Sequence, residues 1–203
     1  MLALGIDTTG SWCSVALVDG AGIRAMSARP MQRGHAEHLA PMVKTLLKQA
    51  GAGVENLGRL VVCTGPGSFT GGRVGLSFAK GLALPHNIPL IGLSALDVWA
   101  AQVDPERQTR VLVVADIRRG QIMTQLFDKG VPQGHPEIQP ADTALPNAEL
   151  AVGSGVNNSD GFVHPALLAW LGLDADPAMC PAEPLYARPP DAKLPGGKTF
   201  RDL

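Results

Sequence analysis

Residues 65–84, GPGSFTGGRVGLSFAKGLAL, hold the groups in this chain that are best suited to bind a ligand. An apolar stretch, Leu60–Cys63, leads into a Gly/Pro-rich loop, and the loop opens directly into an expected helix. Free backbone N–H groups and the positive end of a helix favour anions at such a junction. The chemistry that this arrangement suggests is phosphate binding.

Two phosphate-binding motifs are incomplete in this loop. A P-loop spacing starts at Gly67, but Arg73 and Val74 stand where a P-loop has Lys and then Ser or Thr. A dinucleotide fingerprint starts at Gly65, but Thr70 occupies its third glycine position. The alternative is a tight strand-to-helix turn in which glycines supply unusual dihedral angles and Thr70 caps the helix.

The helix expected over residues 71–84 carries a stripe of small residues, because Gly71, Gly75 and Ala79 recur every four positions. Larger apolar residues flank the stripe, namely Val74, Phe78 and Leu82. Each glycine inside a helix costs about 1 kcal/mol relative to alanine, and close approach of another helix would offset that cost. The partner is either a neighbouring helix of this chain or a helix of another subunit.

Other chemistry has weaker support in the sequence. His35 and His38 lie three apart with Glu37 between them, which leaves a zinc site as an alternative to ordinary positions at a helix start. Ser68 lies in a glycine-rich turn but not in G-x-S-x-G, and nothing nominates its base. Three scattered cysteines argue against both a disulfide framework and a zinc site.

The composition limits the classes of function. The chain has 203 residues, 45% of them hydrophobic, so it can build a real core. Only 4% of the residues are aromatic, so few side chains can stack on bases. The formal net charge is −1 and no Lys/Arg cluster stands out, so no basic surface for a phosphate backbone is indicated. We therefore expect no strong RNA binding by the chain alone. The first residues lack a basic signal-peptide region and no apolar run reaches ~18 residues, so we expect a soluble, cytoplasmic protein without membrane contact.

A repeat organises the chain. Residues 2–20 and 111–130 each read as an apolar strand ending in Asp, a short polar turn, and a second strand ending in Asp twelve residues later. The two Asp pairs are Asp7 with Asp19 and Asp116 with Asp128. We interpret the matched spacing as an internal duplication.

The first copy continues with a strand over 22–28, an amphipathic helix over 34–50, a strand over 60–64, the helix over 71–84, a strand over 89–93 and a helix over 94–103. A three-strand meander followed by alternating helices and strands predicts an α/β, ribonuclease-H-like lobe. We expect two lobes, residues 1–105 and an abbreviated 106–203. In the second, residues 131–147 are rich in Pro and polar residues, and only 150–153 and 165–171 are expected to be ordered.

Duplicated ribonuclease-H-like lobes resemble actin, Hsp70 and the sugar kinases. That resemblance implies a vestigial nucleotide cleft between the lobes, formed by Asp7, Thr8, Thr9, Asp116 and Arg118. Thr9 departs from the superfamily pattern, which has Gly there, and the second turn has two arginines instead of small residues. Gly153-Ser154-Gly155 is only a faint candidate for an adenosine-binding segment.

Several segments together resemble the TsaB (YeaZ-like) family, accessory paralogues of the catalytic subunit TsaD within the glycoprotease-like proteins. They are GIDTTGSWCSVALVD, RGHAEHLAPMV, GPGSFTGGRVGLSFAKGLAL, DIRRGQI and PLYARPPDAK. The match spans nearly the whole chain, and Gly72 stands where the family usually has Leu. TsaD carries a metal-binding H-x-x-x-H, whose two positions fall on Ala95 and Trp99 here. The resemblance therefore implies a non-catalytic scaffold.

The resemblance also implies partners and an interface. TsaB-like proteins pair with TsaD to add a threonylcarbamoyl group to the adenosine beside the tRNA anticodon, and a TsaE-like ATPase joins the cycle. We expect the chain to form a homodimer when TsaD is absent and to contact tRNA only through the complex. We expect no cofactor in the isolated chain. Whether ATP or ADP binds at the joint of the full complex stays open. The implied interface is the face of the two first-lobe helices, at His38, Leu39, Met42, Leu46, Gly71, Arg73, Val74, Gly75, Phe78, Ala79 and Leu82.

Two rival functions stay open on the sequence alone, a metal-dependent peptidase and an ATP-binding enzyme of the sugar-kinase type. For the end of the chain, we expect Leu185 and Tyr186 to pack on the protein and residues beyond Gly196 to be disordered.

Overall fold

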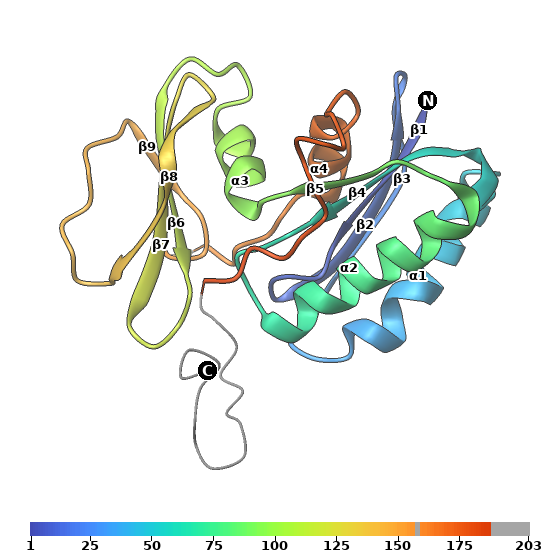
Figure 1. The fold of residues 1–203 in the computed structure, drawn as a ribbon, viewed down its shortest axis with the longest axis horizontal. Helices are drawn as coiled ribbons and strands as arrows, with labels where there is room; N and C mark the ends of the chain where they lie inside the picture. The colour runs from blue at the N-terminus through green and yellow to red at the C-terminus, as the bar shows by residue number, and fades with distance from the viewer. Residues whose placement is uncertain (157–158, 188–203) are drawn as a thin grey trace, which may run out of the picture.

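The computed structural model describes residues 1–156 and 159–187. Two sheets stand side by side with helices between and beside them (Figure 1). The expected disorder after Gly196 lies outside the described residues. Within them, no helix is long and apolar enough to cross a membrane.

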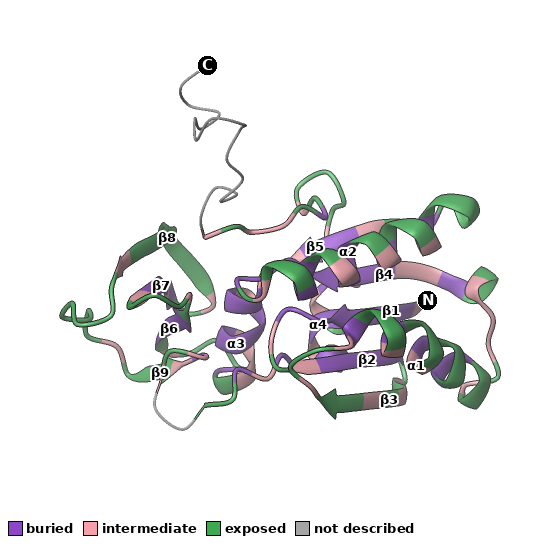
Figure 2. Cartoon of the chain, turned by 90° about the horizontal axis from the view of Figure 1, so that it is seen from below, coloured by how far each residue is buried: buried purple, intermediate pink, exposed green. Residues whose placement is uncertain are grey.

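The first sheet has five strands in the order β3-β2-β1-β4-β5. Its strands are β1 (Leu2–Asp7), β2 (Trp12–Asp19), β3 (Gly22–Pro30), β4 (Leu57–Cys63) and β5 (Leu90–Leu93). β1, β2 and β3 form an antiparallel meander, and β4 and β5 continue the sheet in parallel with β1. Figure 2 shows the central strands of this sheet buried and the edge strand β3 exposed.

The second sheet repeats this order with one strand fewer, as β8-β7-β6-β9. Its strands are β6 (Arg110–Asp116), β7 (Gln121–Asp128), β8 (Val131–Pro140) and β9 (Leu150–Val152). β6 and β7 are antiparallel and β9 is parallel to β6, as β1, β2 and β4 are in the first sheet. The four aspartates that marked the repeat all end their strands, at equivalent places. The fold is a duplicated ribonuclease-H-like α/β fold with an abbreviated second lobe.

In the part of the chain that the structure describes, four α-helices cover the sheets. They are α1 (His35–Gln49), α2 (Phe69–Ala83), α3 (Ala95–Val103) and α4 (Pro165–Leu171), and two 3-10 turns lie at Val54–Asn56 and Leu84–His86. α1 and α2 pack together on one face of the first sheet, where α1 buries Leu39, Val43 and Leu46. α3 and α4 lie between the two sheets (Figure 1).

The lobes share part of their core. One apolar cluster joins Val61 and Ile91 of the first sheet to Val113 and Met123 of the second, with Trp99 of α3 between them. α4 comes late in the sequence but packs on β1 and β2. The division of the chain near residue 105 stays a prediction, although the two sheets do fall on either side of it.

Two predicted elements need correction. Residues 131–140 form the edge strand β8, whereas the sequence favoured irregular chain there. Because β8 pairs with β7 on one side only and is largely exposed, it has no alternating apolar pattern, and prolines are tolerated at such an edge. The cap of α2 is Ser68, which accepts a hydrogen bond from Gly71 N at 3.2 Å, and not Thr70, which is the second residue of the helix.

Candidate functional site: the cleft between the lobes and the surface of α1 and α2

The Gly/Pro-rich loop folds back onto the turn after β1. Ser68 N donates to Thr9 O at 2.5 Å, and Thr8 Oγ1 donates to Gly71 O at 2.7 Å. A Cβ atom built on Gly67 would lie 2.2 Å from Thr9 O, so only glycine permits this approach. The backbone that could have cradled a phosphate therefore contacts the chain itself.

The small-residue stripe of α2 faces the same turn. Gly71, Gly75 and Ala79 are buried, and a Cβ atom on Gly75 would lie 2.5 Å from Thr8 Oγ1. The stripe packs inside the chain, against a turn and a strand rather than a helix. Gly71, Gly75 and Ala79 were expected at the interface with a partner, and this part of the expectation is corrected because their surface is already covered.

Asp7 ends β1 in the centre of this packing and is 1% exposed. Its Oδ1 accepts from Thr9 N at 2.9 Å and from Thr9 Oγ1 at 2.7 Å, while Oδ2 has no hydrogen-bond partner among the described residues. Burial raises the pKa of the Asp7 carboxyl, and the two Thr9 bonds, the nearby Cys63 thiol and His35 oppose that rise. The same burial raises the pKa of Cys63.

A nucleotide held through Asp7, as the superfamily resemblance implies, does not fit this geometry. Asp7, Thr8 and Thr9 are covered by the loop before α2, which leaves no room for a phosphate or a metal ion beside the carboxyl. Asp116 and Arg118 are exposed on the turn of the other lobe. Of these five residues only Arg118 lines the cavity between the lobes, so they do not form one site there.

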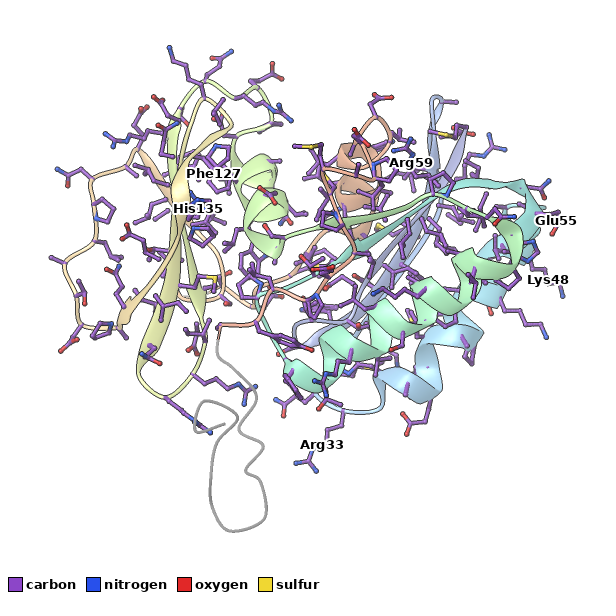
Figure 3. All side chains as sticks on the ribbon, viewed as in Figure 1. Arg33, Lys48, Glu55, Arg59, Phe127 and His135 are labelled. Carbon is purple, nitrogen blue, oxygen red and sulfur yellow. The ribbon has the colours of Figure 1, made fainter. Side chains whose placement is uncertain are left out.

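The cavity lies between the lobes, on the outer side of the closed loop, and has a volume of about 870 Å³. Residues 32–37 around the start of α1, residues 67–71 and Val74 of α2, residues 117–119 of the β6–β7 turn and residues 185–187 line it. These segments meet on the lower side of Figure 1. The cavity is lined by Arg33, which Figure 3 labels near the start of α1, together with Arg118 and Arg119. This grouping leaves no signal in the sequence, because Arg33 and Arg118 are 85 residues apart.

An aromatic cluster holds the last described segment against α2. The Arg73 guanidinium lies 3.7 Å from the centre of the Phe69 ring, and its Nε donates to the Tyr186 hydroxyl at 2.9 Å. Leu185 N donates to Thr64 O at 2.8 Å, and Leu185 packs on the shared core. The prediction that Leu185 and Tyr186 pack on the protein is confirmed.

Comparisons with known proteins decide the family. A family model described as TsaD, tRNA N6-adenosine threonylcarbamoyltransferase, matches residues 28–141, which is more than half of the chain. The chain belongs to the TsaD family. Within this family it is TsaB-like (YeaZ-like), as the resemblance in its motifs predicted.

The relatives of this TsaD-family chain include two proteins named tRNA threonylcarbamoyladenosine biosynthesis protein TsaB. The one from Escherichia coli K12 is 37% identical over 123 residues, 60% of this chain and 53% of that protein. The one from Bacillus subtilis is 32% identical over 127 residues, 63% of this chain and 55% of that protein. The chain thus spans about half the length of these curated relatives.

A solved structure from Pseudomonas aeruginosa, described as similar to peptidase YeaZ, has the same fold with a TM-score of 0.78. It is 25% identical and the match covers 92% of this chain and 99% of that one. An uncharacterized protein of Mycobacterium tuberculosis is 32% identical over 171 residues, 79% of this chain and 78% of that protein.

The histidine pair that the TsaD resemblance places at positions 95 and 99 has no counterpart here. Ala95 and Trp99 are buried in α3, and the Trp99 indole donates to Phe162 O at 3.1 Å. His35 and His38 do not converge with other ligands: His35 Nε2 lies 3.2 Å from Trp12 O, and His38 Nδ1 lies 3.4 Å from an Arg29 nitrogen. In the described ranges, no three His, Cys, Asp or Glu side chains gather as a metal site would require.

The other residues of the implied TsaB-like interface fall into two groups. Leu39 and Leu46 are 1% exposed and belong to the core under α1. The remaining residues reach the surface of α1 and α2, and they are His38, Met42, Arg73, Val74, Phe78 and Leu82. Between the two helices lies a mainly apolar groove of about 490 Å³, lined by Ala36, Leu39, Phe69, Thr70, Arg73, Val74, Ser77 and Phe78.

Proposed function

We propose that this chain is a non-catalytic subunit of the tRNA threonylcarbamoyladenosine machinery and pairs with a TsaD-like catalytic subunit through the groove between α1 and α2. The family match and the naming of its TsaB relatives support the pathway. The scaffold role is supported by the absence of the histidine pair at Ala95 and Trp99. The proposal includes the cytoplasm as location, a TsaE-like ATPase as a further partner, and tRNA contact only within the complex.

The groove between α1 and α2 is the observation that carries the pairing. Phe69 is 44% exposed, and Val74 and Phe78 are half-buried beside it, so a mainly apolar strip runs between two long helices. An apolar helix of a partner that fills such a groove removes this surface from water, which stabilises a complex by about 25 cal/mol per Å² before the cost of association. A second copy of this chain would use the same strip when TsaD is absent.

Size-exclusion chromatography with light scattering tests the proposal on this chain, alone and mixed with the TsaD-like protein of the same organism. We expect a homodimer that exchanges into a complex with that protein. Val74→Asp and Ser77→Arg each place a charge in the groove and should abolish both assemblies. Ser77 is exposed, so its variant keeps the fold even if the Val74 variant loses stability.

Val103→Asp is the matched control, because it makes the same change at a half-exposed valine at the end of α3, outside the groove. It should assemble like the unmodified protein. Complex formation by Ser77→Arg at unchanged affinity would show that the groove is not the interface. A chain that does not bind the TsaD-like protein at all would overturn the proposed pairing.

A peptidase or an ATP-binding enzyme remains the alternative function. Tightly bound stoichiometric zinc, or ATP binding by the isolated chain that Asp7→Asn abolishes, would favour it over the scaffold.

A further inference from the structure

We infer that a small cavity beside α3 binds a linear zwitterion, with the ammonium group of the ligand at Asp97 and its carboxylate group at Arg107. This cavity has a volume of about 240 Å³, and among the described residues it shares no lining residue with the larger cavity at the start of α1. Neither the turn at Asp7 nor the β6–β7 turn lines it. The inference goes beyond the proposed pairing with a TsaD-like subunit and does not depend on it.

The wall of this cavity is mainly apolar and comes from both lobes. Leu93 of β5 and Leu171 of α4 meet Val111 and Phe127 of the second sheet there, and Figure 3 labels Phe127. Cys180 adds a thiol that stays neutral, because burial raises its pKa. At about 30 Å³ per water molecule the cavity has room for roughly eight waters, or for an organic molecule of similar size. Such a wall suits a short hydrocarbon chain.

Asp97 supplies a carboxylate oxygen at one end of the cavity. Its Oδ2 accepts from Ser94 Oγ at 2.6 Å and from Ser94 N at 3.3 Å, as part of the capping box that starts α3. These two bonds fix the orientation of the side chain. Among the described residues, no group donates a hydrogen bond to Asp97 Oδ1. This oxygen is therefore an oriented acceptor for an ammonium group.

Arg107 supplies a guanidinium group from the loop after α3. Asp104 also lines the cavity, but its two oxygens already accept from Thr109 N at 2.9 Å and from Gln108 N at 3.0 Å, which lowers the pKa of this carboxyl and fixes the loop. The stem of Arg107 lies over Gly130, where a Cβ atom would come within 2.6 Å of Arg107 Cδ. No described residue forms a hydrogen bond or an ion pair with the guanidinium group. Its planar donors match a carboxylate.

The length of α3 determines the shape of the ligand. Asp97 lies in the first turn, and Arg107 follows the last helical residue, Val103, so about 9 Å of helix separates the two ends. Ala100 and Ala101 line the cavity between them, and their small side chains leave this length open. An α-amino acid carries both charges on one carbon atom and does not place them at opposite ends. A linear amino carboxylate, with a chain of methylene groups between the charges, does.

An NMR titration of the isotope-labelled full-length chain tests this site, with δ-aminovalerate as the probe. We expect binding in the millimolar range or tighter, with amide shifts confined to α3, the loop after it and the turn at Gly130. Pentylamine and pentanoate each lack one charge and should bind at least about tenfold more weakly, as should leucine. No binding of δ-aminovalerate at tens of millimolar overturns the inference. Equal binding of pentylamine, pentanoate or leucine overturns it as well, because each result removes one of the two charge contacts or their separation.

Substitutions then connect binding to the two charged groups. Arg107→Gln should weaken binding of δ-aminovalerate about tenfold or more and leave binding of pentylamine unchanged. Arg107 is exposed and its guanidinium group has no partner in the described part of the chain, so this variant keeps the fold. Asp97→Asn should weaken binding of δ-aminovalerate and pentylamine alike, also about tenfold. Ala101→Leu fills the cavity without changing a charge and should abolish binding of both probes.

The matched control is Asp142→Asn combined with Arg110→Gln, which makes the same two changes elsewhere. Both residues are exposed and neither lines the cavity. This variant should bind δ-aminovalerate within about twofold of the unmodified chain. Equal weakening in the control and in Arg107→Gln would show a general charge effect and overturn the site, as would unchanged binding in Arg107→Gln.

Discussion

Gly75→Ala should destabilise the protein, although alanine is normally the better helix residue. A Cβ atom at position 75 would lie 2.5 Å from Thr8 Oγ1, the hydroxyl that donates to Gly71 O at 2.7 Å. Alanine must therefore displace this hydroxyl or move α2 away from the turn after β1. Gly81 is the matched control in the same helix, because nothing lies within 4 Å of a Cβ atom there.

The expected magnitudes have opposite signs at the two glycines. Overpacking in a buried site costs about 1–3 kcal/mol, and loss of a buried hydrogen bond about 1–3 kcal/mol more. Against this, replacing glycine by alanine in a helix gains up to about 1 kcal/mol. Gly75→Ala should thus lower the free energy of unfolding by about 1–5 kcal/mol, whereas Gly81→Ala should raise it by about 0.5–1 kcal/mol.

Urea unfolding of the two variants and the unmodified chain measures this difference. The cause is tested by repeating Gly75→Ala in a Thr8→Ala background, which removes the clashing hydroxyl. The other atoms near the new Cβ would be at 3.7 Å, an ordinary contact, so the cost of Gly75→Ala should fall by about 1–2 kcal/mol. Stabilisation by Gly75→Ala, or an unchanged cost in the Thr8→Ala background, would refute the packing of α2 on this turn.

Two further substitutions test buried polar groups. Because burial raises the pKa of Asp7 above 3.8, the folded chain binds this proton more tightly than the unfolded chain, and Asp7 costs stability as pH rises above about 4. Asp7→Asn should therefore become more favourable relative to the unmodified chain from pH 4 to pH 7 in urea unfolding, and a difference independent of pH would contradict this. Arg59 donates to Gly172 O at 3.2 Å and to Ala175 O, which ties β4 to the end of α4. Arg59→Met should lower the free energy of unfolding by about 1.5–3 kcal/mol in the same assay. Arg24→Met, the control at an exposed ion pair, should lower it by no more than about 0.5 kcal/mol. Equal losses in the two variants would contradict a stabilising role for the Arg59 hydrogen bonds.

Much of the fold could be predicted from sequence because the duplication leaves a local signal. Apolar runs that end at Asp7, Asp19, Asp116 and Asp128 are short patterns, and each one ends a strand in the structure. The 3.6-residue periodicity of α1 was equally clear, since its buried face repeats along the helix. β8 was missed because an exposed edge strand buries nothing on either face, so its sequence has no period.

The candidate site was harder to predict because its properties depend on which surfaces meet. The small-residue stripe of α2 correctly signalled a close approach, but the residue types do not say whether the approaching group belongs to this chain or to another. Thr8 and Gly75 are 67 positions apart, and only the parallel pairing of β1 with β4 brings them together. The sequence could therefore predict the contact but not its partner.

The arginines show the same limit for charge. A search for runs of Lys and Arg detects only groups that are adjacent in sequence, and Arg33 lies 85 residues before Arg118. The duplicated fold places the turn after β6 opposite the start of α1, so three arginines line one cavity in a chain with a formal net charge of −1. Net charge governs how strongly the whole surface attracts a polyanion, whereas binding of one phosphate depends on the few groups within a Debye length of it.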